Sequence, residues 1–390
     1  MASQELGLLA VIALMIGVLS LLGVRDTVRS VHVSPSDTIT ESADAVALAR
    51  PGEHAESFFR AQGWRVVERE RDGVTVRSIE SVTRGIRFGF NERFFNTANL
   101  VGVAKDASFI AVMAVGMVAI IILGGIDLSV GSIYALSGVA AAAVLARLAE
   151  SNPGISSLFS IPVGVAVAGA VGSACGVVNG AATVGLRVHP FIITLGGMAV
   201  YRGVAFVATD GQSISGLPDS YTSGGFKANL WGANPVPMLI MVVVAIVGAM
   251  VLSLTVLGRR TFAIGGNETA ARYAGIPVGR VKIVLFTLCG TLAGFAAAIN
   301  TGYYGSASSG DGSGYELRVI AAAVVGGASL SGGRGSAIGA TLGAVIIQLI
   351  DNGIVVLGVD SNYTNIVIGL AIVAAVVIDQ VKHRWATVAR

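Results

Sequence analysis

The stretch Leu-Gly-Gly-Ile-Asp-Leu-Ser-Val-Gly-Ser-Ile-Tyr-Ala-Leu, residues 123–136, decides how this chain folds. It lies inside an apolar run over 107–148, which is too long for one membrane crossing because a spanning helix needs about 20 apolar residues. Its centre holds Asp127, and a carboxylate costs roughly 2.5–3.5 kcal/mol to insert at mid-bilayer. Three structural glycines, which let the backbone leave helical geometry, surround it: Gly124, Gly125 and Gly131.

Two interpretations of the Asp127 segment follow from these residues. In the first, a broken or tightly turned helix pair borders a polar pathway, because irregular backbone at membrane depth is tolerated only where it is buried in protein or lines a wet cavity. In the second, the segment is a cytoplasmic turn in which Asp127 caps the next helix. The residues alone favour neither interpretation.

The composition indicates an all-α polytopic membrane protein. Of the 390 residues, 54% are hydrophobic and 13% are charged, whereas ordinary soluble domains are about 25% charged. The net charge of +3 is too small to suggest nucleic acid as a partner. Cys175 and Cys289 both lie in apolar segments, so neither a disulfide framework nor a metal site is predicted, and the four histidines show no metal-ligand spacing.

Apolar segments long enough to span a bilayer recur along the chain and predict about ten transmembrane helices. They lie at 6–24, 107–124, 130–148, 158–180, 190–208, 236–257, 281–301, 317–330, 335–357 and 363–380.

Residues 25–93 differ in kind from the rest, because they combine many arginines with a nearly equal number of acidic residues. The pattern predicts a short helix at 53–62, and alternating segments at 64–70 and 74–80 flank Arg-Asp-Gly, which predicts a β-hairpin. We expect a small soluble α/β subdomain or a partly ordered insert after the first helix; the alternative is a solvated linker.

The distribution of lysine and arginine predicts the orientation, because short cytoplasmic loops carry the excess of these residues. The loop 258–282 carries five of them, which places it and both termini in the cytoplasm. Arg25 and Arg29 favour the opposite side for the insert, but long translocated segments escape the rule. The expected division is a first helix at 1–24, an extracytoplasmic insert at 25–93, a transmembrane core at 94–380 that includes the loop 258–282, and a cytoplasmic tail at 381–390.

The loop 258–282 contains a predicted short helix, Glu268–Tyr273, with Asn267 as its N-cap and Gly275 as its stop. A helix of this length is not stable alone, so it needs a surface to pack against. It is either a coupling helix that docks on a cytoplasmic motor or an ordinary connector whose arginines only set the topology.

Two stretches closely resemble the permease subunits of carbohydrate ABC importers of the ribose/xylose type. They are Gly-Gly-Ile-Asp-Leu-Ser-Val-Gly-Ser at 124–132 and Ala-Ile-Gly-Gly-Asn-Glu-Thr-Ala-Ala-Arg-Tyr-Ala-Gly-Ile at 263–276. The resemblance runs in order from about Phe94 to the C-terminus. Further blocks that agree with it are 179–180 with 189–196, 201–203, and 323–327 with 332–336.

This resemblance implies a bacterial inner-membrane sugar importer made of two permeases and two ABC ATPases and fed by a periplasmic substrate-binding protein. The second permease would be another copy or a paralogue. The chain has no Gly-x-x-x-x-Gly-Lys-Ser/Thr loop, so it is expected to be no enzyme and to bind no cofactor or metal, with ATP used by the partner. The insert departs from the family pattern, and its position suggests that it touches the binding protein or shields the entrance.

The candidate residues fall into two sets. The resemblance places the ATPase-coupling residues in the loop: Gly265, Asn267, Glu268, Arg272 and Gly275. Because a sugar needs neutral hydrogen-bonding groups and aromatic surface, the substrate-pathway candidates are Asp127, Ser129, Asn179, Asn300 and Tyr303, with Tyr304 beside them. For Asp127 a capping role is equally open, and for Asn300 and the tyrosines so is a role as interfacial anchors.

Other expectations stay open at this point. Arg202 either holds backbone carbonyls, pairs with Asp127 or snorkels. An ion-coupled secondary transporter that uses Asp127, or a passive facilitator of small polar solutes, is the alternative function. The stretch 326–331 echoes 124–129, and in a chain with 52 glycines we expect this match to arise by chance.

Overall fold

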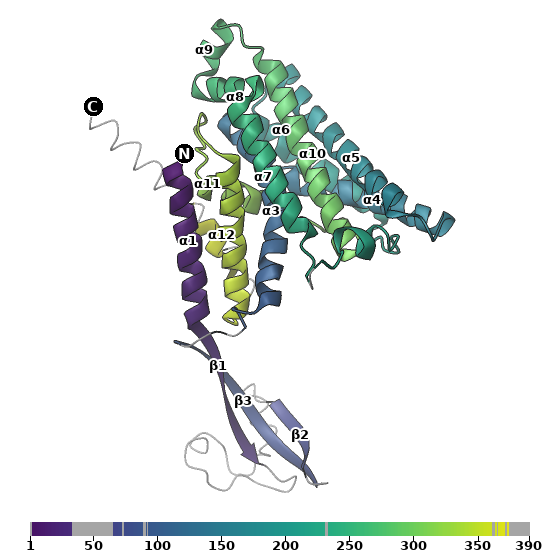
Figure 1. Cartoon of the computed structure of the whole chain (residues 1–390), viewed down its shortest axis with the longest axis vertical. Helices are drawn as coiled ribbons and strands as arrows, with labels where there is room; N and C mark the ends of the chain where they lie inside the picture. The colour runs from purple at the N-terminus through teal and green to yellow at the C-terminus, as the bar shows by residue number, and fades with distance from the viewer. Residues whose placement is uncertain are drawn as a thin grey trace, which may run out of the picture.

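The computed structural model describes residues 2–32, 65–71, 74–88, 91, 93–230, 233–360, 363–364, 366–370 and 373. Within these ranges, eight helices are long and apolar enough to cross a membrane, which confirms a polytopic α-helical protein (Figure 1). They are α1 (Ala2–Leu21), α3 (Thr97–Ile122), α4 (Val130–Ser151), α5 (Ser157–Leu186), α6 (Pro190–Thr209), α7 (Val236–Leu254), α10 (Val278–Tyr304) and α12 (Ala337–Val356).

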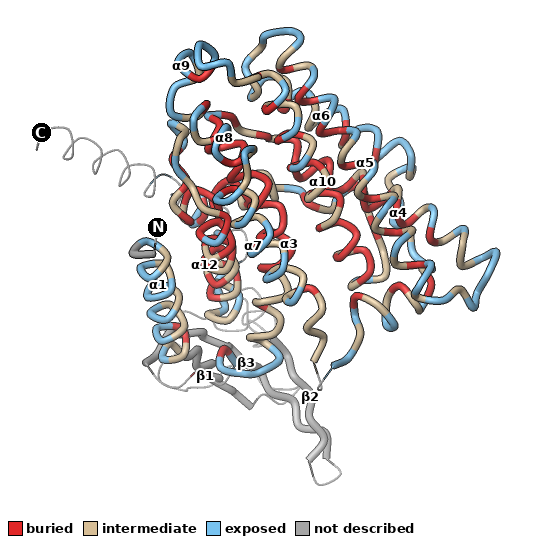
Figure 2. Tube along the Cα trace, turned by 45° about the horizontal axis from the view of Figure 1, so that its top comes forward, coloured by how far each residue is buried: buried red, intermediate tan, exposed pale blue. Residues whose placement is uncertain are grey.

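Helix α3 forms the centre of the bundle. Every residue from 107 to 123 is buried, and this part of α3 is red in Figure 2. It is apolar on all sides, as expected for a helix that neighbours surround completely, and it packs against α7, α10, α12 and the shorter helix α11 (Tyr315–Val325). The run 107–148 is therefore two helices, and the predicted break inside it is confirmed at residues 123–129.

The segment 317–330, predicted as a span, is instead a half-length helix. Helix α11 (Tyr315–Val325) has 11 residues, which at 1.5 Å per residue cover roughly 16 Å, about half of a bilayer core. Irregular backbone over 305–314 precedes it, and Gly327 with φ +93° follows it. The apolar composition was read correctly, but the glycines end the helix early. The predicted span 363–380 lies largely outside the described residues, as does the tail 381–390.

The two glycine-rich stretches that echo each other in sequence end their helices in the same way. Gly124 after α3 and Gly327 after α11 both adopt left-handed backbone, with φ of +84° and +93°. In each case the next amide donates to the carbonyl five residues before it, Gly125 to Ile120 and Ala328 to Ala323. This hydrogen bond across a left-handed residue is the usual closing motif of a helix C-terminus.

The insert forms a three-stranded antiparallel sheet of β1 (Leu22–His32), β2 (Arg65–Arg71) and β3 (Val74–Phe88), in the order β1-β3-β2. The predicted hairpin is confirmed, because β2 pairs with β3 from Arg65↔Glu80 to Arg71↔Val74. Strand β1 continues from α1 without a loop, so the sheet begins at residue 22 rather than 25. The predicted helix at 53–62 lies outside the described residues.

The two ends of the bundle differ. In Figure 1 the N-terminal end of α1 lies at the same end as the short helix α9 (Glu268–Tyr273), and the sheet lies at the opposite end. The Ser336 hydroxyl donates to Glu5 Oε1 at 2.9 Å, which fastens the start of α1 to the turn between α11 and α12.

Candidate functional site

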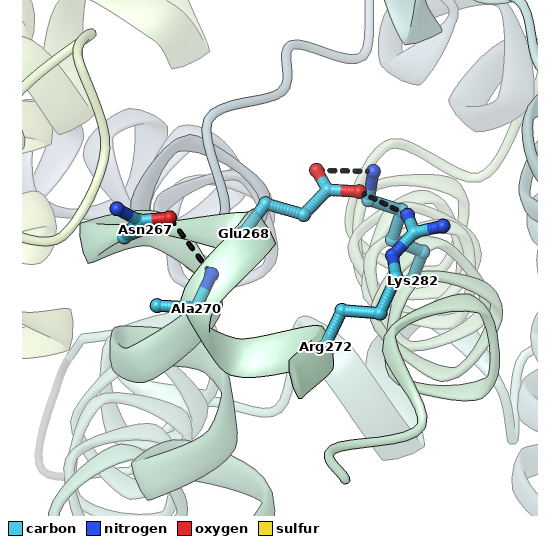
Figure 3. Close-up of polar contacts among 5 residues, drawn as sticks. All are labelled: Asn267, Glu268, Ala270, Arg272 and Lys282. Carbon is cyan, nitrogen blue, oxygen red and sulfur yellow. Dashed lines mark hydrogen bonds and ion pairs between the residues drawn. The ribbon is translucent and has the colours of Figure 1, made fainter. Parts of the chain in front are cut away.

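The predicted coupling loop forms two short helices at one end of the bundle, α8 (Val256–Gly266) and α9. The Asn267 side chain accepts a hydrogen bond from the amide of Ala270 at 2.9 Å, which confirms the predicted N-cap of α9 (Figure 3). Gly275 has φ +79°, which confirms the predicted stop. The local sequence signals thus fix both ends of α9.

Glu268 joins α9 to α10. Its Oε1 lies 3.0 Å from Arg272 Nη2, and its Oε2 lies 2.8 Å from Lys282 Nζ on α10 (Figure 3). The hydrogen bond from Lys282 is the main cause that holds the pKa of Glu268 below its ordinary value. Sequence analysis used Lys282 only as a topology signal, because nothing local shows that the chain reversal after α9 brings it back to Glu268.

The outer surface of α9 is exposed. The Arg272 side chain is 69% exposed, so it keeps donors for a further partner. Tyr273 is 88% exposed, whereas Ala271 is buried on the inner side of the same helix. Tyr273 was not among the predicted coupling residues, and its exposure places a second large side chain beside Arg272 on this surface.

Gly265 serves close packing rather than a turn. It lies within α8, and a Cβ atom there would lie 1.7 Å from the carbonyl oxygen of Ile122, the last residue of α3. The same oxygen accepts a hydrogen bond from the amide of Gly333 at 2.8 Å. Helix α8 therefore packs directly on the junction between the end of α3 and the turn before α12.

Asp127 lies in a buried hydrogen-bond network beside this junction. Its Oδ1 accepts from the amide of Ser129 at 2.8 Å and from the Ser129 hydroxyl at 2.6 Å. The Asn179 amide donates to the Ser129 hydroxyl oxygen at 2.8 Å, and the Tyr201 hydroxyl donates to Asn179 Oδ1 at 2.9 Å. All four residues are buried, and they join the 123–129 turn to α5 and α6.

The capping role considered for Asp127 is not observed, because the N-cap position of α4 belongs to Ser129. Asp127 and Ser129 are buried within the 123–129 turn, whereas Gly124 in the same turn is exposed. Asp127 Oδ2 has no hydrogen-bond partner among the described residues. Sequence analysis missed Tyr201, and it missed Thr194, whose hydroxyl accepts from the amide of Leu128 at 3.1 Å. The available signal was a polar residue on an otherwise apolar helix.

The remaining pathway candidates lie elsewhere, near the C-terminal end of α10. Tyr303 and Asn300 are partly buried there. Lys105 Nζ lies 5.0 Å from the Tyr303 ring centroid and donates to the Tyr304 hydroxyl at 2.6 Å. The Tyr304 hydroxyl donates in turn to Asp106 at 3.2 Å. The structure thus divides the predicted pathway residues into two groups, one at the 123–129 turn and one at the far end of α10.

Arg202 holds backbone carbonyls, one of the three roles considered. Its Nη1 donates to the carbonyls of Ser309 at 2.7 Å and Asp311 at 2.5 Å, both in the irregular segment before α11. Gly131, at the start of α4, also contacts this segment, because a Cβ atom there would lie 2.5 Å from the Gly312 carbonyl oxygen. Helices α4 and α6 thus position the irregular backbone that leads into α11.

A helical bundle with eight helices long and apolar enough to span a membrane, one half-length helix and a buried polar network has the features of a membrane transporter. Residues 99–376 match the family described as branched-chain amino acid transport system / permease component. The chain therefore belongs to this permease family, whose match begins after the sheet.

Relatives with assigned names agree with this membership. The chain is 40% identical over 295 residues to the ribose import permease protein RbsC of Escherichia coli K12, covering 74% of this chain and 88% of that protein. It is 39% identical over 292 residues to RbsC of Bacillus subtilis 168, with 75% and 88% covered. It is 36% identical over 289 residues to the D-allose transport system permease protein AlsC of Escherichia coli K12, with 74% and 85% covered. No solved structure matches the chain.

Proposed function

We propose that this chain is the membrane-spanning subunit of an ATP-driven importer in a bacterial inner membrane, which carries a sugar delivered by a periplasmic binding protein. The observation that carries the proposal is the exposed α8–α9 pair, tied to α3 and α10 at one end of a chain that belongs to a permease family. Relatives named for ribose and D-allose support a monosaccharide, and one named for autoinducer 2 supports the wider class of small polyols.

The end that carries α9 faces the cytoplasm in this proposal. Five cations lie between α8 and the first turns of α10, and cytoplasmic loops are the ones enriched in such residues. The N-terminal end of α1 then lies in the cytoplasm as well, and the sheet lies outside (Figure 1). The cations are Arg259, Arg260, Arg272, Arg280 and Lys282.

In this proposal, partner ATPases hydrolyse ATP and α9 is the part of the permease that they contact. Closure of an ATPase pair on ATP would displace α9. The displacement would pass to α10 through the Glu268–Lys282 ion pair and to α3 through the contact of Gly265 with Ile122. Two rigid contacts, rather than a flexible linker, would thus connect the motor to the bundle. A second permease, a copy or a paralogue, would form the other wall of the path.

The two groups of pathway residues receive different roles. The Asp127 network is buried within one subunit, so we assign it to bracing the 123–129 turn between α5 and α6. The group at the far end of α10 is more accessible, since Tyr304 is 53% exposed. Aromatic rings beside hydroxyl and ammonium groups suit a sugar, so we assign the first substrate contacts to Tyr303 and Tyr304.

Co-purification from mild detergent tests the proposal. The tagged full-length chain should recover a soluble ATPase, identified by mass spectrometry. The Arg272→Glu variant should recover much less of it while still inserting into the membrane. Lys227→Glu, an equal change of charge outside the α8–α9 pair, is the matched control. Normal ATPase recovery with Arg272→Glu would contradict the role of α9.

Transport assays separate this proposal from its alternatives. Uptake of the substrate should stop when ATP is depleted. Uptake that survives ATP depletion but needs an ion gradient would establish a secondary transporter, and uptake that needs neither would establish a passive facilitator.

The sheet is proposed to contact the binding protein or to shield the entrance, because it extends from α1 at the end opposite α9. Removal of residues 30–88 should reduce uptake at low substrate concentration, where delivery by the binding protein limits the rate. Unchanged uptake would count against this role.

A further inference from the structure

A cleft of about 950 Å³ opens beside the α8–α9 pair, between the end of α5, the connection to α6 and the corner from α9 into α10. Its walls combine apolar and basic side chains. The basic lining residues are Arg187, His189, Arg272, Arg280 and Lys282.

The positive charge of this cleft is largely uncompensated. Four arginine and lysine side chains line it against one carboxylate, that of Glu268, and this carboxylate is already bound by Arg272 and Lys282. Within the part of the chain that the structure describes, Arg187 and Arg280 have no hydrogen bond or ion pair to another side chain, and both are exposed. Two guanidinium groups that face one cleft without a carboxylate suit an anion with several oxygens, such as a phosphate.

The helices around the cleft carry exposed apolar side chains directly beside these cations. Leu186, next to Arg187, is 67% exposed, and Ile192 at the start of α6 is 60% exposed. Val284, within the second turn of α10, is 42% exposed. A soluble anion gains nothing from such surface, whereas the acyl chains of a lipid do. Val184 and Ile283 add apolar side chains to the lining of the cleft itself.

We propose that this cleft binds the headgroup of an anionic phospholipid from the cytoplasmic leaflet, with Arg187 and Arg280 as the main ligands of its phosphate. Basic pockets between transmembrane helices on the cytoplasmic side are the usual form of such sites. The proposal rests on the orientation proposed above. A bound lipid would also affect the contact between α9 and α10. Its phosphate would lie beside the Glu268–Lys282 pair, compete with Glu268 for Lys282 and so weaken the link between the two helices.

Native mass spectrometry of the purified full-length chain tests this site. The protein is titrated with phosphatidylglycerol and, separately, with phosphatidylcholine of the same acyl chains, and phosphatidylglycerol should bind more tightly. Each cation near a membrane surface contributes about 1 kcal/mol toward an anionic lipid, or about fivefold in affinity. The double variant R187Q/R280Q should therefore lose about 25-fold in phosphatidylglycerol affinity, while R187K/R280K should keep most of it.

The matched control is R259Q/R260Q, which removes the same charge from exposed positions of α8 outside the cleft. It should leave phosphatidylglycerol affinity unchanged. Equal binding of the two lipids, or an equal loss in the control, would overturn the proposal in favour of diffuse surface charge. Full displacement of phosphatidylglycerol by inorganic phosphate would overturn it in favour of a soluble anion.

An acidic surface of the ATPase is the competing occupant, and the same variants decide it. If R187Q/R280Q keeps phosphatidylglycerol affinity but no longer recovers the ATPase, the cleft is a protein interface and the lipid proposal is wrong. Failure of the importer proposal would give a different result from failure of the lipid proposal. In that case the unaltered chain would recover no ATPase, while its lipid titration would be unaffected.

Discussion

Replacement of Gly265 by alanine should separate the α8–α9 pair from the bundle. The new Cβ would lie 1.7 Å from the Ile122 carbonyl oxygen, where real Cβ atoms stay at least 3.0 Å away, so the two atoms must part by at least 1.3 Å. The obstructing atoms are backbone, which cannot rotate away as a side chain can. The Gly333 amide, 2.6 Å from the same Cβ, is displaced as well.

The size of the effect follows from two terms. Overpacking of a tight contact costs about 1–3 kcal/mol, and loss of the hydrogen bond from Gly333 to Ile122 adds about 0.5–1.5 kcal/mol. We therefore expect Gly265→Ala to lower the free energy of unfolding by about 1.5–4.5 kcal/mol. Because the contact joins α8 to α3, ATP-driven uptake should fall more than membrane insertion does.

Gly266→Ala is the matched control, since no atom lies within 4 Å of a Cβ placed at that neighbouring position. Thermal unfolding of both variants in mild detergent, together with ATP-driven uptake in reconstituted vesicles, measures the difference. The control should melt like the unaltered chain or slightly higher, because alanine favours a helix over glycine. Equal melting temperatures for Gly265→Ala and Gly266→Ala would refute the close-packing argument.

Three further changes probe the buried and exposed charges. Asp127→Ala removes the acceptor of two hydrogen bonds and should lower the free energy of unfolding by about 1–3 kcal/mol. Asp127→Asn keeps an acceptor oxygen and should melt close to the unaltered chain. An equal loss of stability in both variants would show that the charge itself is needed. Because the pKa of Glu268 is held below its ordinary 4.5, its contact with Lys282 is at full strength above that pH and weakens as pH falls through the lowered pKa. Amide exchange in α9 should accelerate only in this acid range and should lose that dependence in Glu268→Gln. Helices α11 and α12 are joined by the ion pair of Arg318 with Asp351, so Asp351→Ala should lower the free energy of unfolding by up to about 3–5 kcal/mol. The double variant with Arg318→Met and Asp351→Leu should recover most of this loss. A double variant as unstable as Asp351→Ala would contradict this expectation.

Local signals predicted a large part of this fold. Eight of the ten apolar segments are spanning helices, Asn267 caps α9 and Gly275 ends it, and the hairpin pairs around Arg-Asp-Gly as expected. Of the other two, the segment 363–380 lies largely outside the described residues, and the segment that contains α11 was predicted as a span because apolar composition alone does not show where a glycine pair ends a helix. The site was predicted less completely, since Lys282 and Tyr201 were not assigned to it.

The sequence by itself determined eight of the helices that are long and apolar enough to span a membrane, where the short helix α9 begins and ends, and which family of permeases the chain belongs to. These properties depend on composition, on spacing and on residues only a few positions apart. Only the tertiary structure decided that Gly265 is needed for packing, that Glu268 reaches Lys282, and that Asp127 and Asn179 lie in one buried network while Tyr303 lies in another place. Those contacts join helices that are distant in the chain, and the way helices pack against one another fixes them, which no local pattern encodes.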